Sequence, residues 1–70
     1  MLTRKMLKLY RIMEEYKVRN GVMPSYQEMS DMMELHSKSG IHRLILALEE
    51  RGALVRLPDR ARAIALRPLP

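Results

Sequence analysis

Hydrogen-bonding and very small side chains gather in one short stretch of this 70-residue sequence. They are Ser39, Gly40, His42 and Arg43. An arginine can bond O6 and N7 of a guanine, the commonest specific contact in the major groove of DNA, and serine and histidine can bond base edges or phosphates. A glycine lets the backbone approach a surface closely or leaves room for a thymine methyl group. These residue types indicate recognition of base edges.

Catalysis and metal binding have no comparable candidates in the sequence. It contains no cysteine and two histidines, so it lacks thiol nucleophiles and thiolate zinc ligands. No Ser/His/Asp spacing stands out, and the acidic residues, including Glu49 and Glu50, fall on predicted helices as solvated charges. We therefore expect no enzyme, no metal site and no cofactor.

The candidate residues lie on a helix predicted over about 38–51. Ser37 is a candidate N-cap, and Gly52 can take the left-handed conformation that ends a helix. An apolar stripe at spacing i, i+3, i+4, i+7 predicts the buried side. Its members are Ile41, Leu44, Ile45 and Leu48. Leu46 then points outward with the base-contacting candidates, where it could contact a thymine methyl or sugar, be covered by the hairpin, or form a protein contact.

Two earlier helices are predicted to support this one. The first spans about 3–20, with Thr3 as N-cap and Gly21 after its end. Its predicted buried face comprises Met6, Leu9, Tyr10, Met13 and Tyr16 or the stem of Lys17, widened by Leu2, Ile12 and Val18. The second spans about 26–35 and begins with a capping box between Ser25 and Glu28. Its predicted buried residues are Met29, Met32 and Met33.

The remaining sequence completes a recognisable arrangement. The tight connection through Leu35 and His36 predicts a helix-turn-helix. After Gly52, residues 53–66 predict a β-hairpin with a basic turn from Pro58 to Arg62, and residues 68–70 a linker start or tail. The predicted fold is mainly α with a small β-hairpin, a three-helix winged helix-turn-helix domain over residues 1–67. Its seven methionines are expected to fill the core, the alternative being an adaptable exposed surface for a partner.

The charge distribution favours nucleic acid as a partner. The net charge is +5, with positive charge towards both ends of the sequence and an acidic segment over 21–36. The candidate contacts to the DNA backbone or minor groove are Ser25, Tyr26, Ser37, Lys38, Arg60 and Arg62. For Arg60 and Arg62 the alternative is a charged turn that keeps an edge strand from pairing with another chain. No apolar run is long enough to span a bilayer, and we expect a soluble cytoplasmic protein.

Several motifs resemble the DNA-binding domain of LexA-type SOS repressors. They are MLTRKMLKLY at the start, GVMPSYQEM before and within the second helix, and SKSGIHRLILALEERG followed by LVRLPDRARAIAL at the third helix and hairpin. The resemblance covers essentially the whole chain, and the last two motifs are highly specific. It implies a bacterial repressor of damage-response genes that binds operator DNA at GTTC-type half-sites. A monomer of this size should bind one half-site weakly, so useful affinity needs two copies on adjacent half-sites, as a homodimer on the DNA, or a separate dimer contact.

The sequence departs from this family at three points. Met6 stands where a glutamine is usual, and Leu46 stands where the most similar branch has a small polar residue. LexA repressors continue into a second domain with a Ser/Lys self-cleaving site and the main dimer contact, so we expect either an isolated domain or a naturally short relative. The alternative function is a LexA-like module that acts through protein contacts, modulating a full-length repressor or the transcription machinery.

Overall fold

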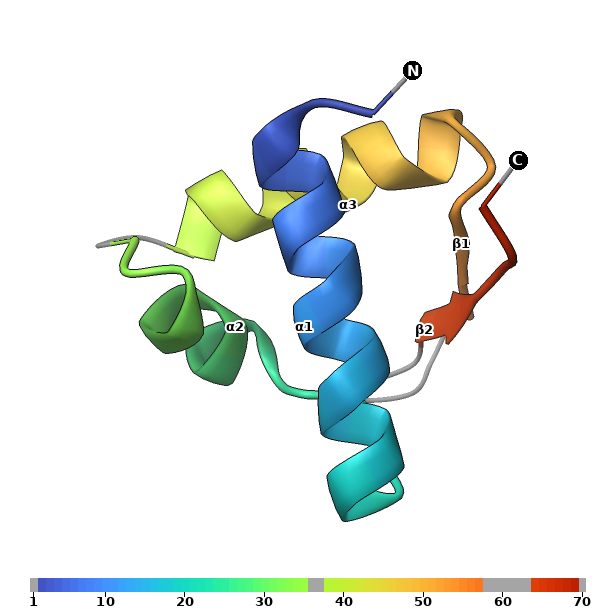
Figure 1. Ribbon diagram of the computed structural model, residues 1–70. Helices are drawn as coiled ribbons and strands as arrows, with labels where there is room; N and C mark the ends of the chain where they lie inside the picture. The colour runs from blue at the N-terminus through green and yellow to red at the C-terminus, as the bar shows by residue number, and fades with distance from the viewer. Residues whose placement is uncertain (1, 36–37, 58–63, 70) are drawn as a thin grey trace.

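The computed structural model describes residues 2–35, 38–57 and 64–69. Three helices, α1 (Arg4–Asn20), α2 (Tyr26–Met32) and α3 (Lys38–Glu50), precede two strands, β1 (Leu54–Arg56) and β2 (Ile64–Leu66). α1 stands at the centre, α2 and the β-hairpin lie on either side of it, and α3 crosses behind its N-terminal half (Figure 1). This arrangement confirms the predicted winged helix-turn-helix.

Both ends of α1 follow the capping signals in the sequence. The Thr3 hydroxyl accepts a hydrogen bond from the Met6 N–H at 3.2 Å. Gly21 takes a φ of 77° and donates its N–H to the Lys17 carbonyl at 2.8 Å. Such a φ is left-handed, so a side chain at this position would strain the backbone. α1 therefore begins and ends where the sequence predicts.

α2 begins at its predicted capping box but ends at Met32 rather than near residue 35. The Leu35 N–H donates to the Ser30 carbonyl at 2.9 Å, and the Glu34 N–H donates to the Asp31 carbonyl at 3.2 Å. These two bonds form a Schellman motif around Glu34, whose φ of 59° is left-handed. The buried Ser30 hydroxyl also donates to the Leu35 carbonyl at 2.7 Å. α2 therefore ends earlier than predicted, and its left-handed position is not occupied by a glycine.

α3 ends as predicted, and the hairpin follows directly. Gly52 has a φ of 75° and donates its N–H to the Glu49 carbonyl at 3.0 Å. β1 pairs antiparallel with β2, with Leu54 opposite Leu66. Both strands lie within the predicted hairpin, residues 53–66. The predicted basic turn, Pro58 to Arg62, lies outside the described residues.

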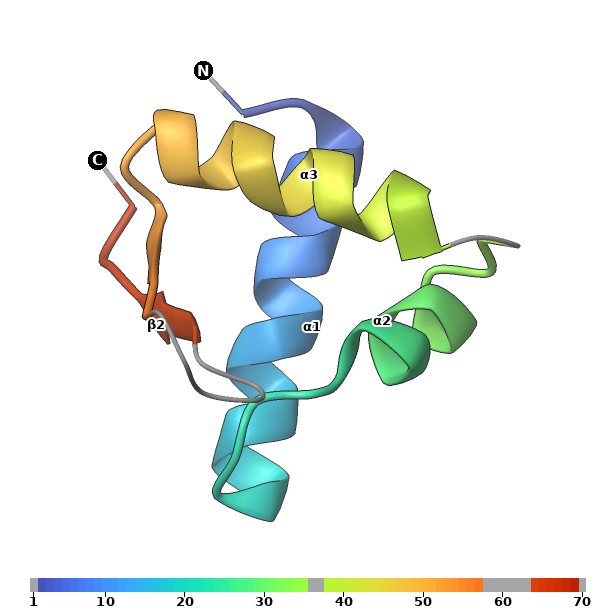
Figure 2. The same ribbon diagram turned by 180° about the vertical axis from the view of Figure 1, so that it is seen from behind.

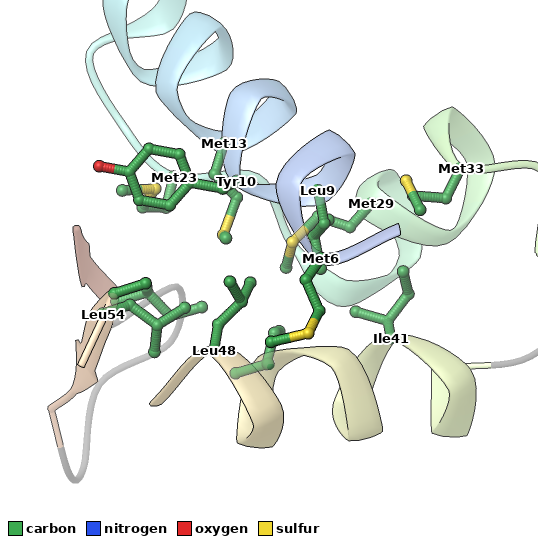
Figure 3. Close-up of a cluster of buried hydrophobic side chains, with 13 residues drawn as sticks. Met6, Leu9, Tyr10, Met13, Met23, Met29, Met33, Ile41, Leu48 and Leu54 are labelled. Atoms are coloured by element: carbon green, nitrogen blue, oxygen red, sulfur yellow. The ribbon is translucent and has the colours of Figure 1, made fainter. Parts of the chain in front are cut away.

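The hydrophobic core draws on every helix and both strands. Side chains from α1, α2, α3 and β1 point towards one another in Figure 3. The buried apolar residues are Met6, Leu9, Tyr10, Met13, Met23, Met29, Met33, Ile41, Ile45, Leu48, Ala53, Leu54 and Ile64. Five of the seven methionines are among them, which supports their predicted role as flexible core residues.

Two predictions of burial were wrong. Val18 is 83% exposed because the last turn of α1 extends beyond α2 and the two strands (Figure 1). Met32 is 38% exposed because α2 stops at this residue and turns its neighbour Met33 into the core instead. In α1 and α2 the apolar spacing identified the inner side of the helix correctly over its middle but not at its C-terminal end.

The Tyr10 hydroxyl joins α1 to the residue that follows β2. It donates to the Arg67 carbonyl at 2.6 Å, and Tyr10 is 4% exposed. We predict that Tyr10→Phe lowers the free energy of unfolding by about 1 kcal/mol. For a domain of this size, that loss corresponds to a fall in Tm of about 4–8 °C. Thermal denaturation followed by circular dichroism measures it.

Tyr26→Phe is the matched control for this prediction. The Tyr26 hydroxyl makes no hydrogen bond to the residues that the structure describes. Its removal should therefore leave Tm nearly unchanged. Equal effects of the two substitutions would contradict a stabilising role for the Tyr10 bond.

Candidate functional site

The outward side of α3 carries a row of residues that repeats the spacing of its buried side. The row consists of Ser39, Arg43, Leu46 and Glu50. On the inner side Ile41, Ile45 and Leu48 each have 0% exposure. A helical period of 3.6 residues places the row roughly opposite them. Seen from behind, α3 crosses in front of α1 (Figure 2). Because its buried residues pack towards α1, the row faces away from the core.

The four predicted base-contacting residues lie together in the first two turns of α3. Ser39, His42 and Arg43 are exposed, and Gly40 is half-buried. Gly40 lies within the regular helix, a conformation that any residue can adopt. Glycine at this position therefore matters for the space it leaves and not for its backbone freedom. Leu44, predicted in the buried stripe, is half-buried and packs against the core.

At the C-terminal end of α3, one charged side chain is less exposed than predicted. Glu49 was expected to be a solvated charge, but it is half-buried and accepts a hydrogen bond from Arg56 Nε at 3.1 Å. This ion pair holds β1 beside the end of α3. Arg43 forms no ion pair with Glu50 or with any other residue in the described parts of the chain. Its exposed guanidinium is therefore accessible to a ligand.

The start of α2 lies beside the first turns of α3. The ring centroids of Tyr26 and His42 are 6.1 Å apart, with the planes tilted by 42°. Tyr26 is half-buried and packs against the core, so a predicted backbone-contacting residue stands next to a predicted base-contacting one. Of the other candidates for backbone contact, Lys38 is exposed and Ser25 half-buried. The remaining three, Ser37, Arg60 and Arg62, lie outside the described residues.

Glu28 fixes the position of this start. Its carboxylate accepts from the Ser25 N–H at 2.7 Å and from the Tyr16 hydroxyl at 2.6 Å. In return the Ser25 hydroxyl accepts from the Glu28 N–H at 3.1 Å. The sequence predicted the capping box but not the bond from Tyr16, because no local signal connects a tyrosine on one helix to a carboxylate on the next. Through this carboxylate, α2 is attached to α1.

The site offers hydrogen-bond donors on a rigid helix. Among the described residues, no three His, Cys, Asp or Glu side chains converge in a way that could hold a metal ion. Every helix in those parts of the chain is too short or too polar to cross a lipid bilayer. The exposed imidazole, guanidinium and ammonium groups suit a ligand rich in acceptor atoms and negative charge.

The chain matches the model of a known protein family. A family model described as the LexA DNA binding domain matches residues 1–63. The match runs through the three helices and β1 and ends just before β2. It covers the residues of the outward row and the capping box of α2, and it agrees with the resemblance of the sequence motifs.

The bond between Tyr16 and Glu28 gives a prediction for the stability of the site. We predict that Tyr16→Phe lowers the free energy of unfolding by about 1–2 kcal/mol, because the hydroxyl donates to a carboxylate. In a Glu28→Ala background the same substitution should cost much less, since the acceptor is already gone. Urea denaturation of the four proteins measures this coupling. An equal cost in both backgrounds would show that the bond does not stabilise the domain.

Proposed function

The chain belongs to the family of LexA DNA-binding domains, and on this premise we propose how it binds DNA. As a member, it is a DNA-binding domain of the repressor type whose partner is double-stranded DNA. In our proposal α3 enters the major groove and contacts the base edges of GTTC-type half-sites. The turn between the strands contacts the DNA backbone or the minor groove. The protein thereby represses genes of the response to DNA damage in the bacterial cytoplasm.

One observation carries this proposal: α3 is buried on one side and hydrogen-bonding on the other. Ile41, Ile45 and Leu48 have no exposed surface, which anchors the helix in the core. Its outer side presents exposed donors on an element that a major groove about 12 Å wide can admit. Because the core fixes the inner side of α3, its outer side chains need little reorganisation to contact a base edge.

The proposed backbone contacts surround this helix. Lys38 is the first residue of α3, and Tyr26 is the first residue of α2. Free N–H groups at helix starts and lysine side chains both bind phosphate oxygens. The proposal includes Ser25, Ser37, Arg60 and Arg62 in the same role. Contacts of this kind set the orientation of the protein on DNA, while the base contacts supply specificity.

A second copy of the chain belongs to the proposal. One module of this size buries too little surface on a single half-site for tight binding. Two copies on adjacent half-sites, as a homodimer on the DNA, would supply the missing affinity. The distance between the two protein copies along the DNA then equals the distance between the two half-sites, which the turns of the double helix set.

A protein-binding module is the second candidate function. Its support is Val18, which is 83% exposed beside an open groove that Tyr10 and Leu66 also line. In this version the domain contacts a full-length repressor or the transcription machinery. The methionines do not add to such a surface, because Met32 is the one described methionine outside the buried core.

Binding to a labelled duplex tests the proposed function. We predict a Kd in the low-micromolar range or tighter for a duplex with a GTTC repeat, measured by fluorescence anisotropy, and much weaker binding to a scrambled duplex. The affinity should fall steeply with salt, with a log–log slope of about −0.9 for each phosphate that the protein neutralises. Equal binding to both duplexes would contradict sequence recognition and leave non-specific DNA binding, and a flat salt response would contradict the phosphate contacts. No binding to either duplex would favour the protein-binding module.

Arg43 provides a residue-level test of base contact. We predict that Arg43→Ala costs about 1–3 kcal/mol of binding free energy on the GTTC repeat and relaxes the preference at one base pair. The matched control is Arg19→Ala, an exposed arginine on the last turn of α1, which should change affinity little. If Arg43→Ala weakens binding equally on every sequence, Arg43 contacts a phosphate and does not contact a base.

A further inference from the structure

We propose that Leu46 recognises the 5-methyl group of a thymine, as a further specificity-determining residue. This inference rests on the proposed function. It concerns an apolar side chain in a row whose other members are polar or charged. The sequence left three roles open for Leu46, and its place in the structure favours one of them.

The first argument is the direction of the side chain. Leu46 follows Ser39 by seven residues and Arg43 by three, which places all three on the outward side of α3. This side faces away from α1 (Figure 2). A leucine that served the core would lie on the side of Ile45 and Leu48, whereas Leu46 is rotated about 100° from Ile45 and about 160° from Leu48 around the helix axis.

The second argument is the packing of the side chain. Leu46 is half-buried, as Leu44 and Ala47 are. Leu44 and Ala47 pack against the core cluster, whereas among the described residues Leu46 does not. Leu44 and Ala47 therefore serve the core, whereas the surface that Leu46 leaves exposed lies on the outer side of α3, where a ligand can reach it.

The third argument is reach along the groove. At a rise of about 1.5 Å per residue, Leu46 lies about 10.5 Å beyond Ser39 along the helix axis. Four stacked base pairs span about 10 Å at about 3.4 Å per step. The outward row from Ser39 to Leu46 therefore matches the length of one four-base half-site. Beyond it the row becomes acidic at the exposed Glu50, which phosphates repel.

The fourth argument is chemical. The thymine methyl is the apolar group that base pairs present in the major groove, and apolar side chains contact it. A GTTC half-site has two thymines, and its complement GAAC has none. Leu46 follows Arg43 by about one helical turn, so with Arg43 on the guanine it is placed to reach the thymines that follow in the half-site. In this proposal Leu46 contacts one of the two thymine methyl groups in each half-site.

Deoxyuridine substitution tests the inference, because deoxyuridine differs from thymidine only by the missing methyl group. Each thymine of the GTTC half-site is replaced in turn, and affinity is measured for the wild type and for Leu46→Ala, Leu46→Met and Leu7→Ala. We expect one replacement to weaken wild-type binding about threefold to tenfold, in line with the loss of one buried methyl. Leu46→Ala should bind the thymine duplex more weakly by a similar factor and lose nothing more on deoxyuridine.

The other two variants serve as controls. Leu46→Met keeps an apolar side chain of similar volume and should retain the preference for thymine. Leu7→Ala changes a leucine of α1 that is 39% exposed and should behave as the wild type does. The wild-type arm with deoxyuridine needs no variant, so the test stands even if Leu46→Ala folds poorly.

The outcomes separate this inference from the proposed function. If the wild type binds the GTTC repeat specifically but tolerates every deoxyuridine, the inference is wrong and the proposed function stands. The inference is also overturned if Leu46→Ala binds both the thymine and the deoxyuridine duplex more weakly than the wild type by the same factor. That result would assign Leu46 to a sugar contact or to stability. Absence of specific binding to the GTTC repeat overturns both.

Discussion

The packing of the inner side of α3 is the interaction on which the rest of the structure depends. α3 contacts α1, α2 and β1, and its residues Ile41, Ile45 and Leu48 are fully buried between them. Burial of one such side chain contributes about 1.5–3 kcal/mol, while a domain below about 80 residues rarely gains more than 3–5 kcal/mol of stability in total from its core. The fold therefore leaves little freedom on this side of α3, and changes that alter binding without unfolding the chain belong on the outer side.

Polar contacts at the edges of the core hold the neighbouring elements at fixed positions relative to α3. Glu28 connects the start of α2 to Tyr16 on α1, and this start carries Tyr26, whose ring lies beside His42. At the other end, Arg56 of β1 is paired with Glu49 of α3. Exposed ion pairs add little to stability, so burial of Leu54 in the core positions β1 and the ion pair only adds to it. The capping box and the bond from Tyr16 fix the start of α2. The surfaces proposed to contact phosphates and bases are thereby presented as one rigid arrangement.

Local signals in the sequence predicted most of this fold, and contacts between elements account for what they missed. The caps at Thr3 and Gly52 could be predicted because each depends on one residue and its backbone. The end of α2 could not, because Glu34 occupies a left-handed position that glycine usually marks. Periodicity also predicted the outward direction of Arg43, since the apolar stripe fixes the opposite side. It could not show that Val18 is exposed, because a period indicates which side faces inward and not whether another element covers it.

The charge along the outer side of α3 determines which end of the helix approaches DNA in the proposed complex. Lys38 and Arg43 lie in its first half, and Glu50 is its last residue. The helix dipole has the same sense, with about half a positive charge at the N-terminus and half a negative charge at the C-terminus. Phosphates attract the first half and repel the second, so a helix that lies along the groove with its N-terminal half deepest satisfies both. This orientation also brings the start of α2 to the phosphates beside the groove, since Tyr26 and His42 keep it next to the first turns of α3.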